Sequence, residues 1–86
     1  MTDDVFDFPC DFPIKAMGKT QPDFYQIVID LLRVHVPDLD ETTLKVQPSR
    51  NGRYQSVTLT VRATSREQLD AIYQALTDSD HVMMAL

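Results

Sequence analysis

The side chains best suited to chemistry are few and widely spaced in this 86-residue chain. Cys10 is its single cysteine, and His35 and His81 are its two histidines. No H-x-x-x-H or C-x-x-C spacing occurs, and a metal site needs three or four convergent ligands. A nucleophilic cysteine needs a positive charge beside its thiolate, and the only nearby cation in the sequence is Lys15. We therefore expect no metal, no cofactor and no cysteine-based catalysis.

The hydroxyl and glycine residues give no stronger signal for catalysis. Ser49, Ser56 and the threonines lack a recognisable base and orienting group. Gly18 and Gly52 are too far apart to form a phosphate-cradling loop. Lys19 precedes an expected helix and could hold an anion at its N-terminus. An enzyme of unknown reaction at the loop after Gly18 is therefore kept as one alternative.

The first half of the chain predicts a strand followed by a helix. Residues 12–17 alternate apolar and polar side chains, and Gly18 ends the run. Thr20 is the expected helix cap, Pro22 suits the first turn, and Pro37 ends the helix at about residue 35. The apolar stripe of this helix comprises Phe24, Ile27, Val28, Leu31 and Leu32.

A hairpin follows, because residues 43–50 alternate and the pair Asn51-Gly52 is a strong two-residue turn signal. Pro48 cannot donate a backbone hydrogen bond, which predicts that the first hairpin strand lies at a sheet edge. The apolar sides of both strands are expected to face the helices. The predicted opposing pairs are Arg50 with Arg53, Val46 with Val57 and Leu44 with Leu59.

The chain then predicts a second helix and a last strand. Ser65 and Gln68 have the spacing of a capping box, as do Thr64 and Glu67. The helix stripe comprises Leu69, Ile72, Tyr73 and Leu76. Residues 81–86, HVMMAL, form a short apolar strand. If that strand faces the helices, the inward side chains are Val82, Met84 and Leu86, with Met83 exposed.

These elements in order give an α+β, ferredoxin-like β-α-β-β-α-β sandwich. Right-handed crossovers place the first and third strands at the centre of a four-stranded antiparallel sheet, with two helices on one face. We assign residues 11–86 to a single domain and residues 1–10 to an acidic N-terminal tail. Val5, Phe6 and Phe8 in that tail either belong to a frayed terminus or dock on the domain or a partner.

Composition narrows the classes of function. The net charge of −5 and pI near 4.6 argue against DNA and RNA, because phosphate binding depends on Lys and Arg. No apolar run approaches the ~20 residues of a membrane span, and the start lacks a basic signal-peptide region. The single cysteine fits a reducing compartment. We therefore expect a cytoplasmic protein without a membrane contact.

Several segments together resemble a known family. They are the Phe-Pro at residues 8 and 9, F-x-x-K-x-M-G at 12–18, the hairpin VQPSRNGRYQSVTLTVRAT, QLDAIYQAL and the terminal HVMMAL. Over almost its whole length the chain resembles the YbeD-like family of small bacterial proteins. Members of that family look like regulatory ACT domains, so the resemblance implies the same fold and suggests a regulatory role, with no activity and no site residues attached.

The face of the sheet away from the helices is the candidate interaction surface. Strand alternation makes it polar, and it is either solvated or used for docking. The last strand has no charge or proline to deter a partner, and methionines adapt to irregular surfaces. The candidate surface residues are Lys15, Met17, Tyr54, Ser56, Thr58, Arg62, His81 and Met83.

The leading hypothesis is a non-enzymatic regulatory or adaptor module. It self-associates or docks on a protein partner, with a small amino-acid-like effector as a further option. The alternative is an RNA-binding module that uses Tyr54 and the hairpin arginines. Its weakness is that Tyr54 is the single aromatic side chain on a face that would need two or three to stack bases.

Overall fold

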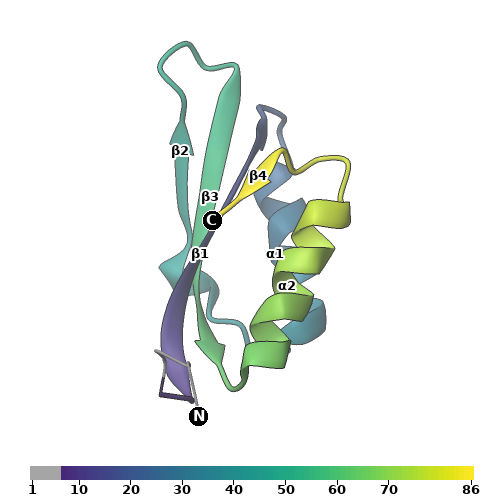
Figure 1. Cartoon of the computed structure of the whole chain (residues 1–86). Helices are drawn as coiled ribbons and strands as arrows, with labels where there is room; N and C mark the ends of the chain where they lie inside the picture. Colours follow the sequence, from purple (N-terminus) through teal and green to yellow (C-terminus); the bar gives the residue numbers. More distant parts are fainter. Residues whose placement is uncertain (1–6) are drawn as a thin grey trace.

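The computed structural model describes residues 7–86, and within them one antiparallel sheet is covered on one face by two helices (Figure 1). The elements are β1 (Cys10–Lys19), α1 (Phe24–His35), η1 (Glu41–Thr43), β2 (Lys45–Pro48), β3 (Tyr54–Ala63), α2 (Arg66–Asp78) and β4 (Met84–Ala85). Val5 and Phe6 lie outside the described residues. Phe8 is half-buried and packs against the core.

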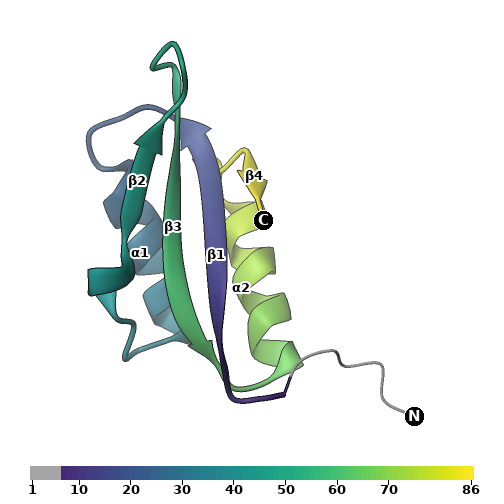
Figure 2. The same ribbon diagram turned by 90° about the vertical axis from the view of Figure 1, so that its left-hand side faces the viewer.

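The strand order is β2-β3-β1-β4, so β1 and β3 are central and β2 and β4 are the edges (Figure 2). The predicted ferredoxin-like sandwich is therefore confirmed. The two central strands pair over ten residues, from Cys10 opposite Ala63 to Lys19 opposite Tyr54. Pro48 lies on the edge strand β2, as its missing N–H predicts.

Period-two alternation decides which side chains enter the core. Ile14, Ala16, Val57 and Leu59 face the helices and are at most 1% exposed. Across from them, α1 and α2 contribute apolar stripes at helical spacing. The buried helix residues are Phe24, Val28, Ile29 and Leu32 of α1 and Leu69, Ile72 and Leu76 of α2.

The start of α1 differs from the prediction. The helix is capped at Asp23, which makes no side-chain cap hydrogen bond, so the assignment of Thr20 as the cap was wrong. The Thr20 hydroxyl instead donates to the Gly52 carbonyl at 2.7 Å, and its N–H donates to the Arg53 carbonyl at 2.9 Å. Thr20 therefore fastens the β1–α1 connection to the β2–β3 hairpin. The helix ends at His35, as predicted from Pro37.

The hairpin has the predicted register but a different turn. Val46 lies opposite Val57, while the Ser49 N–H donates to the Tyr54 carbonyl at 2.7 Å and leaves a four-residue loop, residues 50–53. A type I′ turn needs positive φ at both central residues, but among residues 7–86 only Gly52 has it, at 77°. The asparagine instead uses its side-chain oxygen to accept from the Arg53 N–H.

The edge strand β2 does not pack under the helices. Val46 is 46% exposed, although its partner Val57 is fully buried. The expectation that both hairpin strands face the helices was therefore wrong for β2, because the two helices cover β1 and β3 and leave this edge exposed. Leu44 precedes β2, outside the ladder, and packs half-buried against the core.

The predicted capping box of α2 is present in a modified form. The Ser65 hydroxyl accepts from the Gln68 N–H at 3.1 Å, as expected. The Gln68 side-chain oxygen accepts from the Thr64 N–H at 2.7 Å, one residue earlier than in a standard box. Its amide nitrogen donates to the His35 carbonyl, so one side chain joins the start of α2 to the end of α1.

The last strand is shorter than predicted, and its sidedness differs. A turn closed by the Val82 N–H and the Ser79 carbonyl interrupts the alternation before the strand begins. Val82 is therefore buried, whereas Met84 pairs with Met17 and lies on the opposite side of the sheet. The alternative in which Met84 and Leu86 face the helices does not hold, since both are more than half exposed.

Candidate interaction face of the sheet

One face of the sheet has no helix over it and is turned toward the viewer in Figure 2; we call it the open face. The pairing registers arrange its side chains in rows across the strands. One row runs Gln47, Ser56, Met17, Met84. The next runs Lys45, Thr58, Lys15, Leu86, the last contact being a reciprocal pair of backbone hydrogen bonds.

The open face is apolar near the end where β1 finishes and β3 begins. Met17, Gly18, Tyr54, Met83 and Met84 line a hollow of about 260 Å³, which we call the methionine hollow. Met83 and Met84 are 61% and 53% exposed. A second hollow beside it measures about 190 Å³, and both are smaller than the ~300–1,000 Å³ of typical small-molecule pockets. The dimensions suit single side chains better than a whole metabolite.

The second hollow extends the first toward the hairpin edge. It shares Met17 and Tyr54 with the methionine hollow, so the two adjoin. Its lining is Lys15, Met17, Gln47, Pro48, Ser49, Tyr54, Gln55 and Ser56. The result is an apolar strip with a polar rim.

Positive charge surrounds this strip. Six of the eight basic residues lie on the open face or in the hairpin loop beside it, namely Lys15, Lys19, Lys45, Arg50, Arg53 and Arg62. On the paired strands of residues 7–86, Asp11 is the one acidic residue of this face, and it pairs with Arg62 at 3.4 Å. Beside the face, Asp38 and Asp40 line a hollow with Arg62, and Asp80 lines one with Lys19. The exposed sides of the helices carry the opposite charge, on Asp30, Glu67, Asp70 and Asp78. The acidic molecule thus has one basic face.

The structure brings only part of the predicted surface together. Lys15, Met17 and Tyr54 together line the second hollow, and Thr58 lies opposite Lys15 in the next row. Ser56 occupies the centre but is only 8% exposed, and its hydroxyl lies 3.5 Å from the Gln47 carbonyl oxygen.

The remaining predicted residues lie at the periphery. Arg62 is near the far end of the sheet, in its pair with Asp11. His81 is exposed beside β4, with its ring Nδ1 3.4 Å from the Gln21 amide nitrogen. Met83 links the two regions, because it lines both the methionine hollow and a separate hollow beside His81.

Sequence reasoning missed Met84 and the role of Gly18. A Cβ at Gly18 would lie 2.3 Å from the His81 carbonyl oxygen and 2.6 Å from a Phe24 ring carbon. The missing side chain therefore lets the segment before β4 cross close to β1, which places Met83 and Met84 beside Met17. A glycine within a strand pattern is a recognised sign of close backbone approach, and that was the available signal.

The described residues contain no arrangement suited to metal binding or to covalent catalysis. No group of three or more His, Cys, Asp or Glu side chains in residues 7–86 could hold a metal ion. The Thr20 hydroxyl is already engaged with Gly52, and Cys10 is half-buried against the core. None of the helices in this part of the chain is both long and apolar enough to span a membrane.

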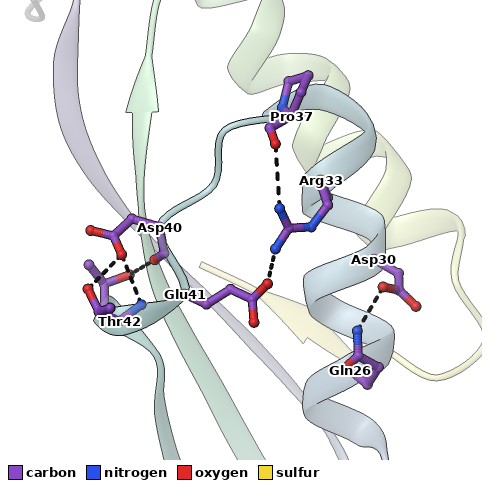
Figure 3. A network of polar contacts seen from close by, with 8 residues as sticks. Gln26, Asp30, Arg33, Pro37, Asp40, Glu41 and Thr42 are labelled. Atoms are coloured by element: carbon purple, nitrogen blue, oxygen red, sulfur yellow. Dashed lines mark hydrogen bonds and ion pairs between the residues drawn. The ribbon is translucent and has the colours of Figure 1, made fainter.

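A separate polar network shapes the connection between α1 and β2 (Figure 3). Asp40 Oδ1 accepts from the Thr42 hydroxyl at 2.6 Å and from its N–H at 3.0 Å, and these bonds lower the pKa of the Asp40 carboxyl. Arg33 donates to the Glu41 carboxylate and the Pro37 carbonyl. The network orders residues 37–43 and offers no convergent ligands.

Fold and surface define a small α+β domain whose prominent feature is an apolar strip on an uncovered sheet. The chain belongs to the family described as "Protein of unknown function (DUF493)", which matches residues 3–86. This confirms the predicted resemblance to a small bacterial family of the YbeD type.

Similar proteins cover nearly the whole chain. A "UPF0250 protein NE1487" from Nitrosomonas europaea is 54% identical over 95% of this chain and 94% of its own length. A UPF0250 protein from Paraburkholderia phytofirmans is 45% identical over the full chain and 97% of its own length. The solution structure of HP0495 from H. pylori covers 98% of this chain and 88% of its own, with a TM-score of 0.73 at 16% identity. That structure supports the fold alone.

Proposed function

We propose that this domain is a cytoplasmic, non-enzymatic regulatory or adaptor module that associates with a protein through its open face. The observation that carries the proposal is the exposed pair Met83 and Met84, which lines a hollow with Tyr54, with Leu86 exposed in the next row. Exposed apolar side chains gathered on one face and rimmed by polar residues are typical of interaction sites. The non-enzymatic part rests on the lack of a nucleophile with its base, or of a metal cluster, in residues 7–86.

A small amino-acid-like effector is the finer version of this proposal, suggested by the resemblance to ACT domains. The hollows lie on an uncovered sheet face and do not enclose such a molecule within one copy of the chain. An effector would therefore bind where a second copy or a partner completes the hollow. Light scattering and chemical-shift mapping against a metabolite library test this version; a strict monomer with no shift changes contradicts it.

The association itself is tested by replacing Met84 with glutamate and using the variant as bait in the native cell extract. We expect loss of the proteins that the unchanged chain retains, because a buried charge without a partner is costly at an interface. Val34→Glu is the matched control, since Val34 is 75% exposed on α1, away from the sheet. Equal capture by all three baits would exclude the open face.

RNA binding through the same face is the second candidate, and one observation favours it. The basic residues converge on the sheet face that RNA-recognition motifs use. Tyr54 is, however, the single aromatic side chain among the described residues of that face, where base stacking contributes ~1–3 kcal/mol per base. Binding to mixed-sequence RNA at ~50 mM salt is the test, since electrostatic attraction is strong there. No binding under that condition would eliminate this candidate.

A further inference from the structure

We infer that the open face receives an acidic segment of a partner protein, with one large apolar side chain of that segment inserted in the methionine hollow. This inference rests on the proposed function and specifies its partner. Three features of the structure carry it: the distribution of charge, the form of the hollow and the chemistry of the sheet edges.

Charge complementarity determines the sign of the partner. Lys15 and Lys19 line hollows that adjoin the methionine hollow, and Lys45 lies in the row of Lys15. Arg50 and Arg53 lie in the adjoining loop. Within residues 7–86, Asp11, Asp38 and Asp40 line a hollow with Arg62, whose place on β3 is remote from the methionine hollow. Asp80 lines a separate hollow with Lys19 and Met83. Complementary potentials accelerate encounter and reject like-charged partners. A partner with several carboxylates fits this surface, whereas a basic one is repelled.

The hollow determines the anchor. Its walls are almost wholly apolar, from Met17, Tyr54, Met83 and Met84, and its volume of about 260 Å³ suits one large side chain. Methionine side chains are unbranched and adapt to the shape of what they contact. Leu, Met or Phe on the partner would bury apolar area there, while flanking Asp or Glu residues reach the lysines.

The edges of the sheet argue for binding on the face in preference to strand addition. Ser49 pairs with Tyr54 and Gln47 with Ser56, so by alternation Val46 and Pro48 of β2 point their backbone groups outward. Pro48 therefore has no N–H to offer a new strand. On the other side, β4 has only two residues, and Pro13 stands on the part of β1 that β4 leaves uncovered.

The test is selection of a random 12-residue peptide library displayed on phage against the full chain at ~50 mM salt. We expect enriched sequences with several Asp or Glu around one Leu, Met or Phe. Synthetic copies should bind the Lys15→Glu/Lys45→Glu variant at least about tenfold more weakly, since like charges then meet across the contact. Arg66→Glu, a charge reversal at the first residue of α2, is the matched control and should bind as the unchanged chain does.

Each other outcome overturns the inference in a distinct way. Enriched peptides that lack acidic residues but are lost with Met84→Glu would refute the acidic partner and leave the proposed association intact. No enrichment, or enrichment insensitive to Met84→Glu, would refute both. A dimer in light scattering that Met84→Glu dissociates would assign the face to a second copy of the chain. Binding of mixed-sequence RNA with no acidic-peptide enrichment would assign it to nucleic acid.

Discussion

At the scale of single residues, Gly18 has the largest effect on the candidate site. Its backbone lies so close to His81 and the Phe24 ring that no larger residue fits. Gly52 is constrained differently: it has open space around it but a φ of 77°. The two glycines therefore represent two separate physical requirements, close approach and backbone conformation.

Gly18→Ala should destabilise the domain by about 1–3 kcal/mol, the usual range for overpacking a well-packed site. Because the nearest atom is a backbone oxygen, relief requires movement of the segment before β4. Urea unfolding measures the loss, and methyl shifts of Met83 and Met84 report the displacement. Gly52→Asn is the control: asparagine tolerates positive φ, so this variant should cost far less. Equal stability of Gly18→Ala and the unchanged chain would refute the close approach.

The Asp40 carboxyl provides a test by titration. Its pKa lies below the ordinary value of 3.8, chiefly because the Thr42 hydroxyl donates to the carboxylate. A group with a lowered folded-state pKa contributes stability above its unfolded pKa, and this is lost as pH falls through the folded pKa. Thr42→Ala should therefore raise the pKa of Asp40 toward 3.8 in a carboxyl-detected NMR titration. Thr42→Ser retains the hydroxyl and should leave the pKa low; an unchanged pKa in Thr42→Ala would disprove the attribution.

The sequence predicted which kinds of side chain lie on the open face better than it predicted which of them lie next to one another. Lys15, Met17 and Tyr54 were placed on the correct face by alternation, which is a local property. Met84 was not identified as a site residue, because a turn before β4 shifts the alternation; that turn contains His81, whose carbonyl oxygen lies close to Gly18. Arg62 was placed on the correct face, but it lies far along β3 from the hollow. Alternation predicts the side of the sheet on which a side chain lies, and not its position along the strand.

At the scale of elements, most of the architecture followed from the sequence because local signals agreed with one another. The stripes of α1 and α2, the capping spacing of Ser65 and Gln68 and the edge position of Pro48 each indicated the same fold. The start of α1 was misassigned because a threonine with capping chemistry was used for a long-range bond to Gly52 instead. Propensity cannot distinguish a local partner from one 32 residues away.

The N-terminal cap of α2 predicts a measurable loss of stability. Ser65→Ala removes the acceptor of the Gln68 N–H and should lower the free energy of unfolding by about 1 kcal/mol. Gln68→Ala should have a larger effect, since it removes bonds to Thr64 and to the His35 carbonyl of α1 together. Urea unfolding of both variants gives the comparison. Ser65→Asp is the control, because aspartate also caps helices; a loss as large as that of alanine would contradict the capping role.

At the scale of the whole molecule, net charge and local charge disagree. The net value of −5 predicts repulsion from anions, yet the open face is basic because most Lys and Arg residues lie on or beside it. The net charge governs interactions at long range, and the basic residues of the open face govern interactions at short range. The shortest dimension of the molecule is 21 Å, while screening acts over ~10 Å at 0.1 M salt and ~30 Å at 0.01 M.

Because the molecule is thicker than one screening length and thinner than the other, we expect its binding to an anionic surface first to rise and then to fall as salt is added. Near ~0.01 M salt at pH 7, screening is so weak that a cation-exchange resin also repels the carboxylates on the helix side. The resin should therefore retain the protein weakly. At intermediate salt the resin interacts mainly with the basic face, so retention should reach a maximum. At higher salt, screening weakens that attraction and retention should fall. Lys15→Glu/Lys45→Glu should abolish the maximum. A steady fall in retention from the lowest salt would mean that the separation of charge between the two faces does not govern how this protein meets an anionic surface.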